Sequence, residues 1–239
     1  MRSFSKLLLS LLLIISLVAA RAEAGPDWDE MANGGGDAGS MVASAQPVVG
    51  AGALNSLTGR LSNPPSIGPG GGDFEDMYLF RIVDPLGFSA TTVFPPGFAD
   101  FDTMLFLFNP DGTGLLGNDD AFTGTLQSTI APPGDDGTMI PGPGDYLLAI
   151  SGFQNVPLSV TGSIFDFSLP FEVSGPDGPG GFDPLSGWSA QGDTGDYVII
   201  LEGAEFIPEP TSLALLAFVG LATAGCRRSR FRRPSRVAS

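Results

Sequence analysis

Short apolar runs, separated by clusters of Gly, Pro, Asn and Asp, follow one another along the chain from Ala53 onward. This spacing is typical of an all-β sandwich, because each run is long enough for a strand and none keeps a helical period. A missing amide donor does not interrupt a sheet when it lies between strands, and this holds for the prolines at positions 64, 65, 69, 85, 95, 96, 110, 132, 133, 141 and 143. The pattern predicts strands over residues 54–61, 77–83, 87–93, 103–109, 146–152, 164–173 and 197–202.

One strand pattern occurs twice. Gly144-Asp145-Tyr146 and Gly195-Asp196-Tyr197 each open a continuous apolar segment. Gly-Asp favours a turn, and an unbroken apolar centre is typical of a strand that is covered on both sides. We therefore expect two equivalent core strands whose tyrosines pack in the interior.

The N-terminus has the pattern of a secretory signal peptide. Arg2 and Lys6 precede the apolar run Leu7 to Ala20, and the small residues Ala22 and Ala24 follow it. This order predicts a signal helix over residues 1–24, passage through the secretion translocon and cleavage by signal peptidase after Ala24. Residues 25–52 are rich in small residues and are expected to form a flexible leader.

The C-terminus combines an apolar segment with a basic end. Pro208-Glu209-Pro210 precedes the apolar residues 212–225, and six arginines lie beyond them. A helix of about 15 residues reaches about 22 Å, which is short for a bilayer core of about 30 Å. The segment predicts a short transmembrane helix, with the arginines in the cytoplasm and the middle domain outside. The role of Cys226, beside the arginines, stays open.

The tail over residues 207–239 resembles the bacterial PEP-CTERM sorting signal, in which a Pro-Glu-Pro triplet, a short apolar helix and an arginine cluster occur in this order. The resemblance implies recognition by an exosortase, with Pro208, Glu209 and Pro210 marking the processing region. It also implies a protein that crosses the inner membrane, is anchored transiently and ends at the cell surface or outside the cell. Whether the tail is cut stays open.

The charge of the middle region is one-sided. Residues 25–206 hold all the acidic residues except Glu23 and Glu209, but only Arg60 and Arg81 among the basic ones. Such a surface repels nucleic acid and anionic membranes, and its natural counterpart is a cation. Two interpretations stay open: acidic groups that keep the surface soluble, and acidic groups that bind cations.

The residues that most hydrolases need are missing. The chain has no histidine, which excludes a His-dependent triad and a typical zinc site, and its one cysteine lies in the tail. A glycosidase or lyase with paired carboxylates is the enzyme class left, but nothing in the sequence marks a pair. We therefore expect no enzyme.

The most informative stretch is Phe101 to Asp120. It predicts a strand, an Asn-Pro-Asp-Gly turn at residues 109–112, a short return strand and then the acidic loop Asn118-Asp119-Asp120. Together with the later Gly-Asp-Tyr strand, residues 73–203 are similar to the bacterial pre-peptidase C-terminal domain, where the same motifs recur in the same order.

That resemblance implies a jelly-roll-like antiparallel β-sandwich over residues 53–206, in a family of which some members bind calcium. Calcium takes six to eight oxygen ligands, which carboxylates at a strand start and a nearby loop could supply. The candidate ligands are Asp102, Asn118, Asp119 and Asp120, with Asp111 placed in the turn instead. The alternative is that these aspartates only cap turns through the backbone.

These features favour a non-catalytic exported protein of the cell surface or extracellular matrix, stabilised by calcium and in contact with extracellular polysaccharide. The alternative is a carbohydrate-binding or adhesive module. Trp188 lies in a Gly/Pro-rich insertion and is the candidate glycan contact, against the alternative that it seals the edge of the core. No nucleic-acid partner is expected.

Overall fold

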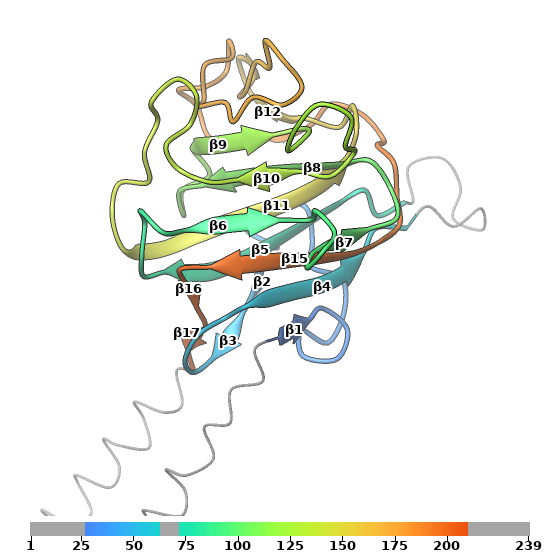
Figure 1. The fold of residues 1–239 in the computed structure, drawn as a ribbon, viewed down its shortest axis with the longest axis vertical. Coiled ribbons are helices and arrows are strands. Elements are labelled where there is room, and N and C mark those ends of the chain that lie inside the picture. The colour runs from blue at the N-terminus through green and yellow to red at the C-terminus, as the bar shows by residue number, and fades with distance from the viewer. Residues whose placement is uncertain (1–26, 63–71, 210–239) are drawn as a thin grey trace, which may run out of the picture. The chain divides into compact units, whose positions relative to one another are not determined.

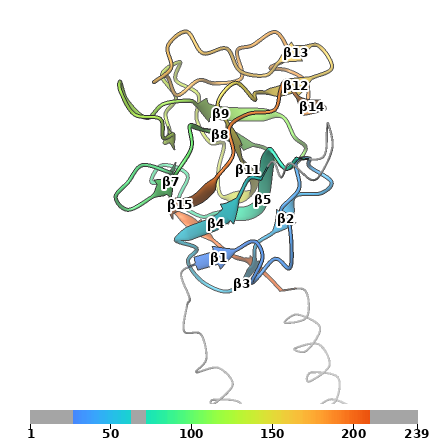
Figure 2. The same ribbon diagram turned by 90° about the vertical axis from the view of Figure 1, so that its right-hand side faces the viewer.

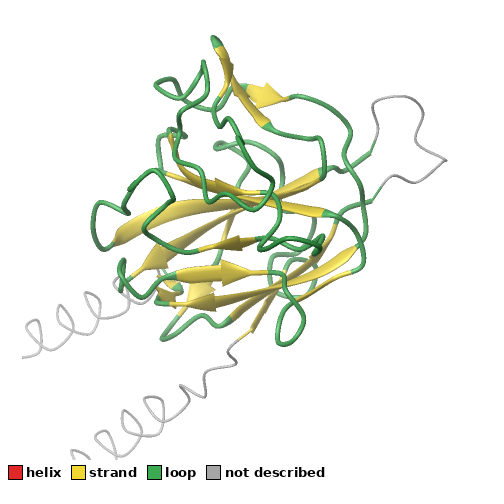
Figure 3. Ribbon diagram, turned by 45° about the horizontal axis from the view of Figure 1, so that its top comes forward, coloured by secondary structure: helices red, strands yellow, loops and turns green. Residues whose placement is uncertain are grey.

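The computed structural model describes residues 27–62 and 72–209. The predicted signal peptide, Pro210 and the apolar and arginine-rich parts of the predicted tail lie outside these residues. The chain divides into two compact units at Ile207, and the fold below is that of the first unit. Its described elements are all strands (Figure 3), so the all-β, sandwich-like fold is confirmed. Within residues 27–62 and 72–209, no helix is long and apolar enough to cross a membrane.

The first sheet has the strand order β1-β4-β15-β6-β10, with β7 added beside β15 (Figure 1). Its strands are β1 (Asp27–Asp29), β4 (Ser56–Arg60), β6 (Ser89–Thr91), β7 (Phe98–Ala99), β10 (Thr129–Ile130) and β15 (Asp196–Glu202). Buried and less buried residues alternate along β15. This alternation indicates that one face of the first sheet is packed and the other faces outward.

The second sheet has the order β16-β5-β11-β8-β9, with β2 added beside β5. Its strands are β2 (Gln46–Pro47), β5 (Glu75–Ile82), β8 (Thr103–Phe108), β9 (Gly114–Asn118), β11 (Gly144–Gly152) and β16 (Ala204–Glu205). Every residue of β8 and β9 is buried. The second sheet is therefore covered on both faces, which explains its unbroken apolar runs.

Two hydrophobic clusters cover those two faces. The inner one joins side chains of both sheets, such as Tyr78 and Phe80 of β5 with Ile199 of β15. The outer one joins Phe106 of β8 to Ile164, Phe165 and other residues of the irregular segments that cover the second sheet. A small sheet of β12 (Pro157–Ser159), β13 (Gly162–Ser163) and β14 (Gly187–Trp188) lies beyond β8 and β9 (Figure 2).

Six of the seven predicted strands are present, as β4, β5, β6, β8, β11 and β15. The predicted strand over 164–173 is wrong, because this segment contains no strand. The next residue, Ser174, forms an isolated bridge with Gly117. Its apolar residues Ile164 and Phe165 are buried, but they belong to the cover of the outer cluster. The apolar run correctly indicates that Ile164 and Phe165 are buried, but these residues are buried without pairing in a sheet.

The two Gly-Asp-Tyr segments form β11 and β15, and both tyrosines are buried. They are not equivalent. β11 lies between β5 and β8 and is buried along most of its length, whereas Val198 and Ile200 of β15 stay half-buried on the outer face.

The N-terminal segment is ordered from residue 27, against the expectation of a flexible leader. β1 pairs in parallel with β4, and β2 pairs in parallel with β5. β3 (Val49–Gly50) follows β2, and the final strand is β17 (Ile207–Pro208). The Ile207 amide donates to the Val48 carbonyl, just before β3, at 2.8 Å. Trp28 is buried, and its indole N–H donates to the Gln46 amide at 2.7 Å. A Cβ at Gly34 would lie 2.0 Å from that amide, so the turn requires glycine.

The buried hydrophobic residues of the described chain all lie between Trp28 and Phe206. A fragment of residues 25–207 therefore contains the whole of this core, without the predicted signal peptide and tail.

Trp28→Ala tests whether the N-terminal segment is part of the fold. Removing this buried ring should lower the unfolding free energy of residues 25–207 by about 3–5 kcal/mol in urea titrations. Met31→Ala is the matched control, because Met31 is exposed in the same segment and should change stability by less than about 0.5 kcal/mol. Equal stability of the two variants would contradict the packing described here.

Candidate functional site: two carboxylate clusters

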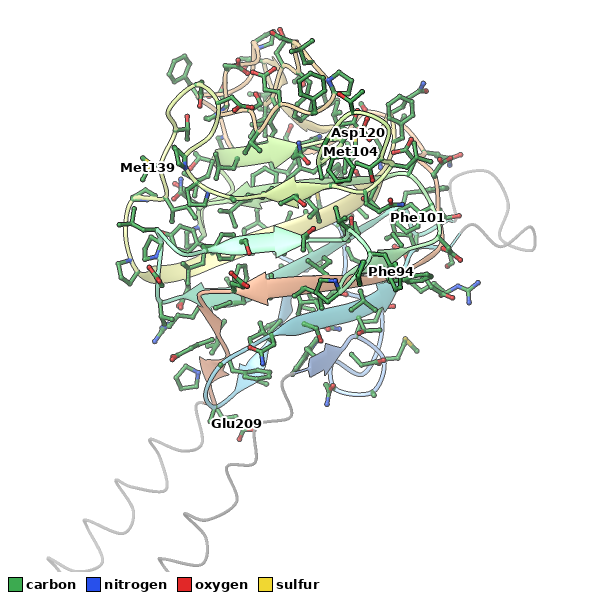
Figure 4. All side chains as sticks on the ribbon, in the orientation of Figure 1. Phe94, Phe101, Met104, Asp120, Met139 and Glu209 are labelled. Atoms are coloured by element: carbon green, nitrogen blue, oxygen red, sulfur yellow. The ribbon has the colours of Figure 1, made fainter. Side chains whose placement is uncertain are left out.

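The structure brings three of the four proposed cation ligands together. Asp102 precedes β8, and Asp119 and Asp120 follow β9, the strand that returns antiparallel to β8. One carboxylate oxygen from each lies within 4.8 Å of the others. We call these three residues the Asp119 cluster. Figure 4 labels Asp120 in the upper right part of the view, in the loop that follows β9.

The carboxylates of the Asp119 cluster are held without neutralising partners. Oδ1 of Asp102 and Oδ1 of Asp119 are buried and have no hydrogen-bond partner among the described residues. Burial, reinforced by the neighbouring carboxylates, raises the pKa of Asp119 to about 7 and that of Asp102 to about 6. Burial also raises the pKa of Asp120. Full ionisation of this cluster is therefore unfavourable unless a positive charge compensates it.

Asn118 lies beside the cluster, but its amide is already engaged. Its Nδ2 donates to the carbonyls of Asp120 and Glu172, each at 2.9 Å, and its Oδ1 accepts from the Thr129 amide at 2.7 Å. Asn118 therefore fixes the backbone of the acidic loop. In this geometry its contribution to a cation site is to position Asp119 and Asp120.

Asp111 behaves as a turn residue. Its Oδ1 accepts from the amide and the hydroxyl of Thr113, at 3.0 and 2.7 Å, and these bonds lower its pKa. It lies in the hairpin turn, at the opposite end of β8 from Asp102. The contrast is informative, because an aspartate that caps a turn makes the bonds that Oδ1 of Asp102 and Oδ1 of Asp119 lack.

Trp188 packs edge-on against Phe106, with ring centroids 5.8 Å apart, and donates its indole N–H to the Ser40 carbonyl at 2.8 Å. These contacts join β14 to the N-terminal segment and to the outer cluster. They account for the ring by packing, and its glycan contact stays a prediction. Pro208 and Glu209 fall at the end of the described residues, and their sorting role likewise stays a prediction.

The structure contains a second carboxylate cluster, which the sequence analysis does not predict. It consists of Asp37, Asp73 and Asp76, whose oxygens also lie within 4.8 Å of one another. We call it the Asp76 cluster. Asp76 is the second residue of β5, Asp73 lies just before this strand, and Asp37 comes from the loop after β1. A cavity of about 380 Å³ beside it is lined by polar residues that include Ser40, Ser44 and Glu75.

A chain of buried hydrogen bonds supports Asp76. Its Oδ2 accepts from the Tyr197 hydroxyl at 2.5 Å, and the hydroxyls of Tyr197 and Tyr78 lie 2.6 Å apart. Tyr78 lies 3.4 Å from Oε2 of Glu30. Asp76 is fully buried, yet its Oδ1 has no partner among the described residues. Asp76 of the second sheet is therefore held at Oδ2 by Tyr197 of the first sheet, whereas its Oδ1 makes no hydrogen bond to the described residues.

Burial dominates the protonation of this cluster as well. It raises the pKa of Asp73 to about 8, with a further contribution from Asp37. Burial likewise raises the pKa of Asp76, of Glu30 and of Glu75. Without a cation, Asp73 therefore holds its proton at neutral pH.

One sequence signal could have revealed this cluster. Asp76 stands two residues before Tyr78 and four before Phe80, so all three point to the same, inner face of β5. An acidic residue in an inward position is uncommon and indicates a functional or paired group. Asp37 could not be placed, because it lies far away in the segment expected to be flexible.

The donor set of both clusters consists of oxygen. Carboxylates favour hard cations such as calcium or magnesium over zinc or copper, which prefer nitrogen and sulfur ligands. The orphaned buried oxygens fit such an ion. No family model and no curated protein matches the chain.

The raised pKa values give a pH dependence. In the unfolded chain these aspartates ionise near pH 4, whereas in the folded chain Asp102, Asp119 and Asp73 ionise near pH 6, 7 and 8. Between these limits the folded state binds more protons, so the unfolding free energy of residues 25–207 in EDTA should fall as the pH rises from about 4 to about 8.

Urea titrations at pH 5 and pH 8 measure this change. Saturating calcium should remove most of the decline, because the ion replaces the protons. A stability in EDTA that rises over this range would contradict the assigned protonation.

Proposed function

We propose that this chain is an exported, non-catalytic protein of the cell surface or extracellular matrix, whose sandwich-like domain is stabilised by calcium at the Asp119 and Asp76 clusters. One observation carries the cation proposal. In the described part of the chain, the buried side-chain oxygens or nitrogens without a partner are Oδ1 of Asp76, Asp102 and Asp119, and all three belong to the two clusters.

Buried polar atoms are almost always paired in folded proteins, because an unpaired one costs about 1–3 kcal/mol. Three such atoms, each on a residue that belongs to a cluster of three carboxylates, support a ligand shared by the cluster. Calcium fits best, since it accepts carboxylates in flexible geometry and completes its shell with backbone carbonyls and water.

The remainder of the proposal concerns location. The predicted signal peptide and the PEP-CTERM-like tail support export, transient anchoring and sorting by an exosortase. The jelly-roll-like topology and the relation to the pre-peptidase C-terminal domain belong to the same proposal. The composition supports a passive role, because the chain contains no histidine and its one cysteine lies in the tail.

Thermal unfolding of residues 25–207 tests the cation proposal. Calcium at millimolar concentration should raise the midpoint by several degrees relative to EDTA, because a ligand that binds only the native state stabilises it. Asp76→Asn and Asp119→Asn should each reduce the rise, and the double variant should abolish it. Glu202→Gln removes one exposed negative charge outside both clusters and should keep the full rise. An unchanged midpoint in the unsubstituted fragment would refute calcium binding.

Cell fractionation tests the sorting proposal. The full-length chain with Pro208, Glu209 and Pro210 replaced by alanine should stay in the membrane fraction at unprocessed mass, whereas the unsubstituted chain should lose its tail. Pro141→Ala, a proline substitution outside the tail sequence, is the control. Identical processing of the triple variant would rule out this triplet as the recognition element.

A further inference from the structure

Exposed apolar side chains lie on the loops next to the Asp119 cluster. They lie on three loops, residues 121–127, 153–155 and 168–172, and the exposed fractions are Phe122 56%, Leu126 55%, Leu169 51%, Phe153 41% and Phe171 41%. We call these five residues the apolar rim. Exposed large apolar groups that gather at one place mark an interaction surface.

Backbone hydrogen bonds join two of the loops to residues of the cluster and the third to Thr103, which follows Asp102. The Asp120 amide donates to the Pro170 carbonyl at 2.8 Å, the Phe153 amide donates to the Asp102 carbonyl at 2.9 Å, and the Thr103 amide donates to the Leu126 carbonyl at 2.9 Å. The three loops meet there because the start of β8 lies beside the ends of β9 and β11. The rim and the carboxylates therefore form one surface.

An ion at the Asp119 cluster would face outward. Asp102 and Asp120 are half-exposed, while Asp119 is 92% buried, with a relative exposure of 8%, and leaves Oδ1 without a partner. With one oxygen from each residue, the three carboxylates supply only part of the six to eight oxygens that calcium takes. The remaining positions are open to oxygens of a ligand that approaches across the rim.

The chemistry of this surface narrows the ligand. The five rim side chains are Phe and Leu, the residues that enter the boundary between lipid headgroups and acyl chains, and they offer no hydrogen bond to a sugar hydroxyl. We propose that the Asp119 cluster and the apolar rim form a calcium-dependent docking site for an anionic phospholipid surface. Lipid phosphates complete the calcium shell, and the rim enters the boundary region. This inference rests on the proposed calcium site.

The negative charge of this domain makes binding to an anionic bilayer depend on calcium. The only basic residues between 25 and 206 are Arg60 and Arg81, and both are paired with aspartates, Asp196 and Asp145. Asp193 adds a negative charge near Asp102. Without the ion this face repels an anionic bilayer, so electrostatic attraction has to come from the bound cation.

Vesicle co-sedimentation of residues 25–207 tests the inference, with vesicles of equal phosphatidylglycerol and phosphatidylcholine. One millimolar calcium should strengthen binding at least tenfold over EDTA, and pure phosphatidylcholine vesicles should bind weakly. Phe122→Ser/Phe171→Ser should weaken binding at least tenfold while keeping the calcium-dependent rise in thermal midpoint. Phe182→Ser, which removes a 98% exposed ring outside the three loops, should bind like the unsubstituted fragment.

The other outcomes separate the two proposals. A thermal rise with calcium but no vesicle binding refutes the docking site and leaves the cation proposal intact. Calcium-dependent binding to polygalacturonate in place of vesicles replaces the lipid surface with an acidic polysaccharide. Equal loss in the Phe182 and Phe122/Phe171 variants rejects the rim as the contact. No thermal rise and no binding refutes both proposals.

Discussion

Buried carboxylates without a buried positive partner are the constraint on which the rest of this structure depends. Asp76, Asp119 and Glu30 are buried, and the only basic side chains of the middle region, Arg60 and Arg81, are engaged at the surface, 3.4 Å from Asp196 and 2.8 Å from Asp145. A buried charge that is not compensated is expensive. The chain therefore has to take up either protons or cations, and that choice connects its stability to the ionic composition of its surroundings.

The same constraint explains the use of tyrosine at the centre of the sandwich. The hydroxyls of Tyr78 and Tyr197 connect Asp76 on the second sheet with Glu30 beside the first, through contacts of 2.5 to 3.4 Å. Gly59 makes room for this chain, because a Cβ there would lie 2.2 Å from the Tyr197 hydroxyl. The two sheets are thus joined by apolar packing and also by one continuous line of polar contacts.

The sequence predicts the fold where apolar runs coincide with sheet pairing. Strands such as β8 and β11 can be predicted from their unbroken apolar sequences, because both of their faces are buried. The strands of residues 27–50 could not be predicted, because each is only two or three residues long and shows no alternating pattern. Parallel backbone pairing and single buried side chains such as Trp28 hold this segment in place. The Asp119 cluster is local to one hairpin and could be predicted. The Asp76 cluster requires Asp37 to meet β5, and no short motif encodes that contact.

The polar line through the core also has a consequence for when the chain is able to fold. Tyr197 meets Tyr78 across 119 positions and Asp76 across 121, and β15, which carries Tyr197, is the central strand of the first sheet. Contacts this distant in sequence close late and slowly. A chain whose residues 196–202 are not yet free to pair has no central strand for that sheet. Such a chain cannot complete the first sheet, so the two layers of the sandwich join only after β15 has become available.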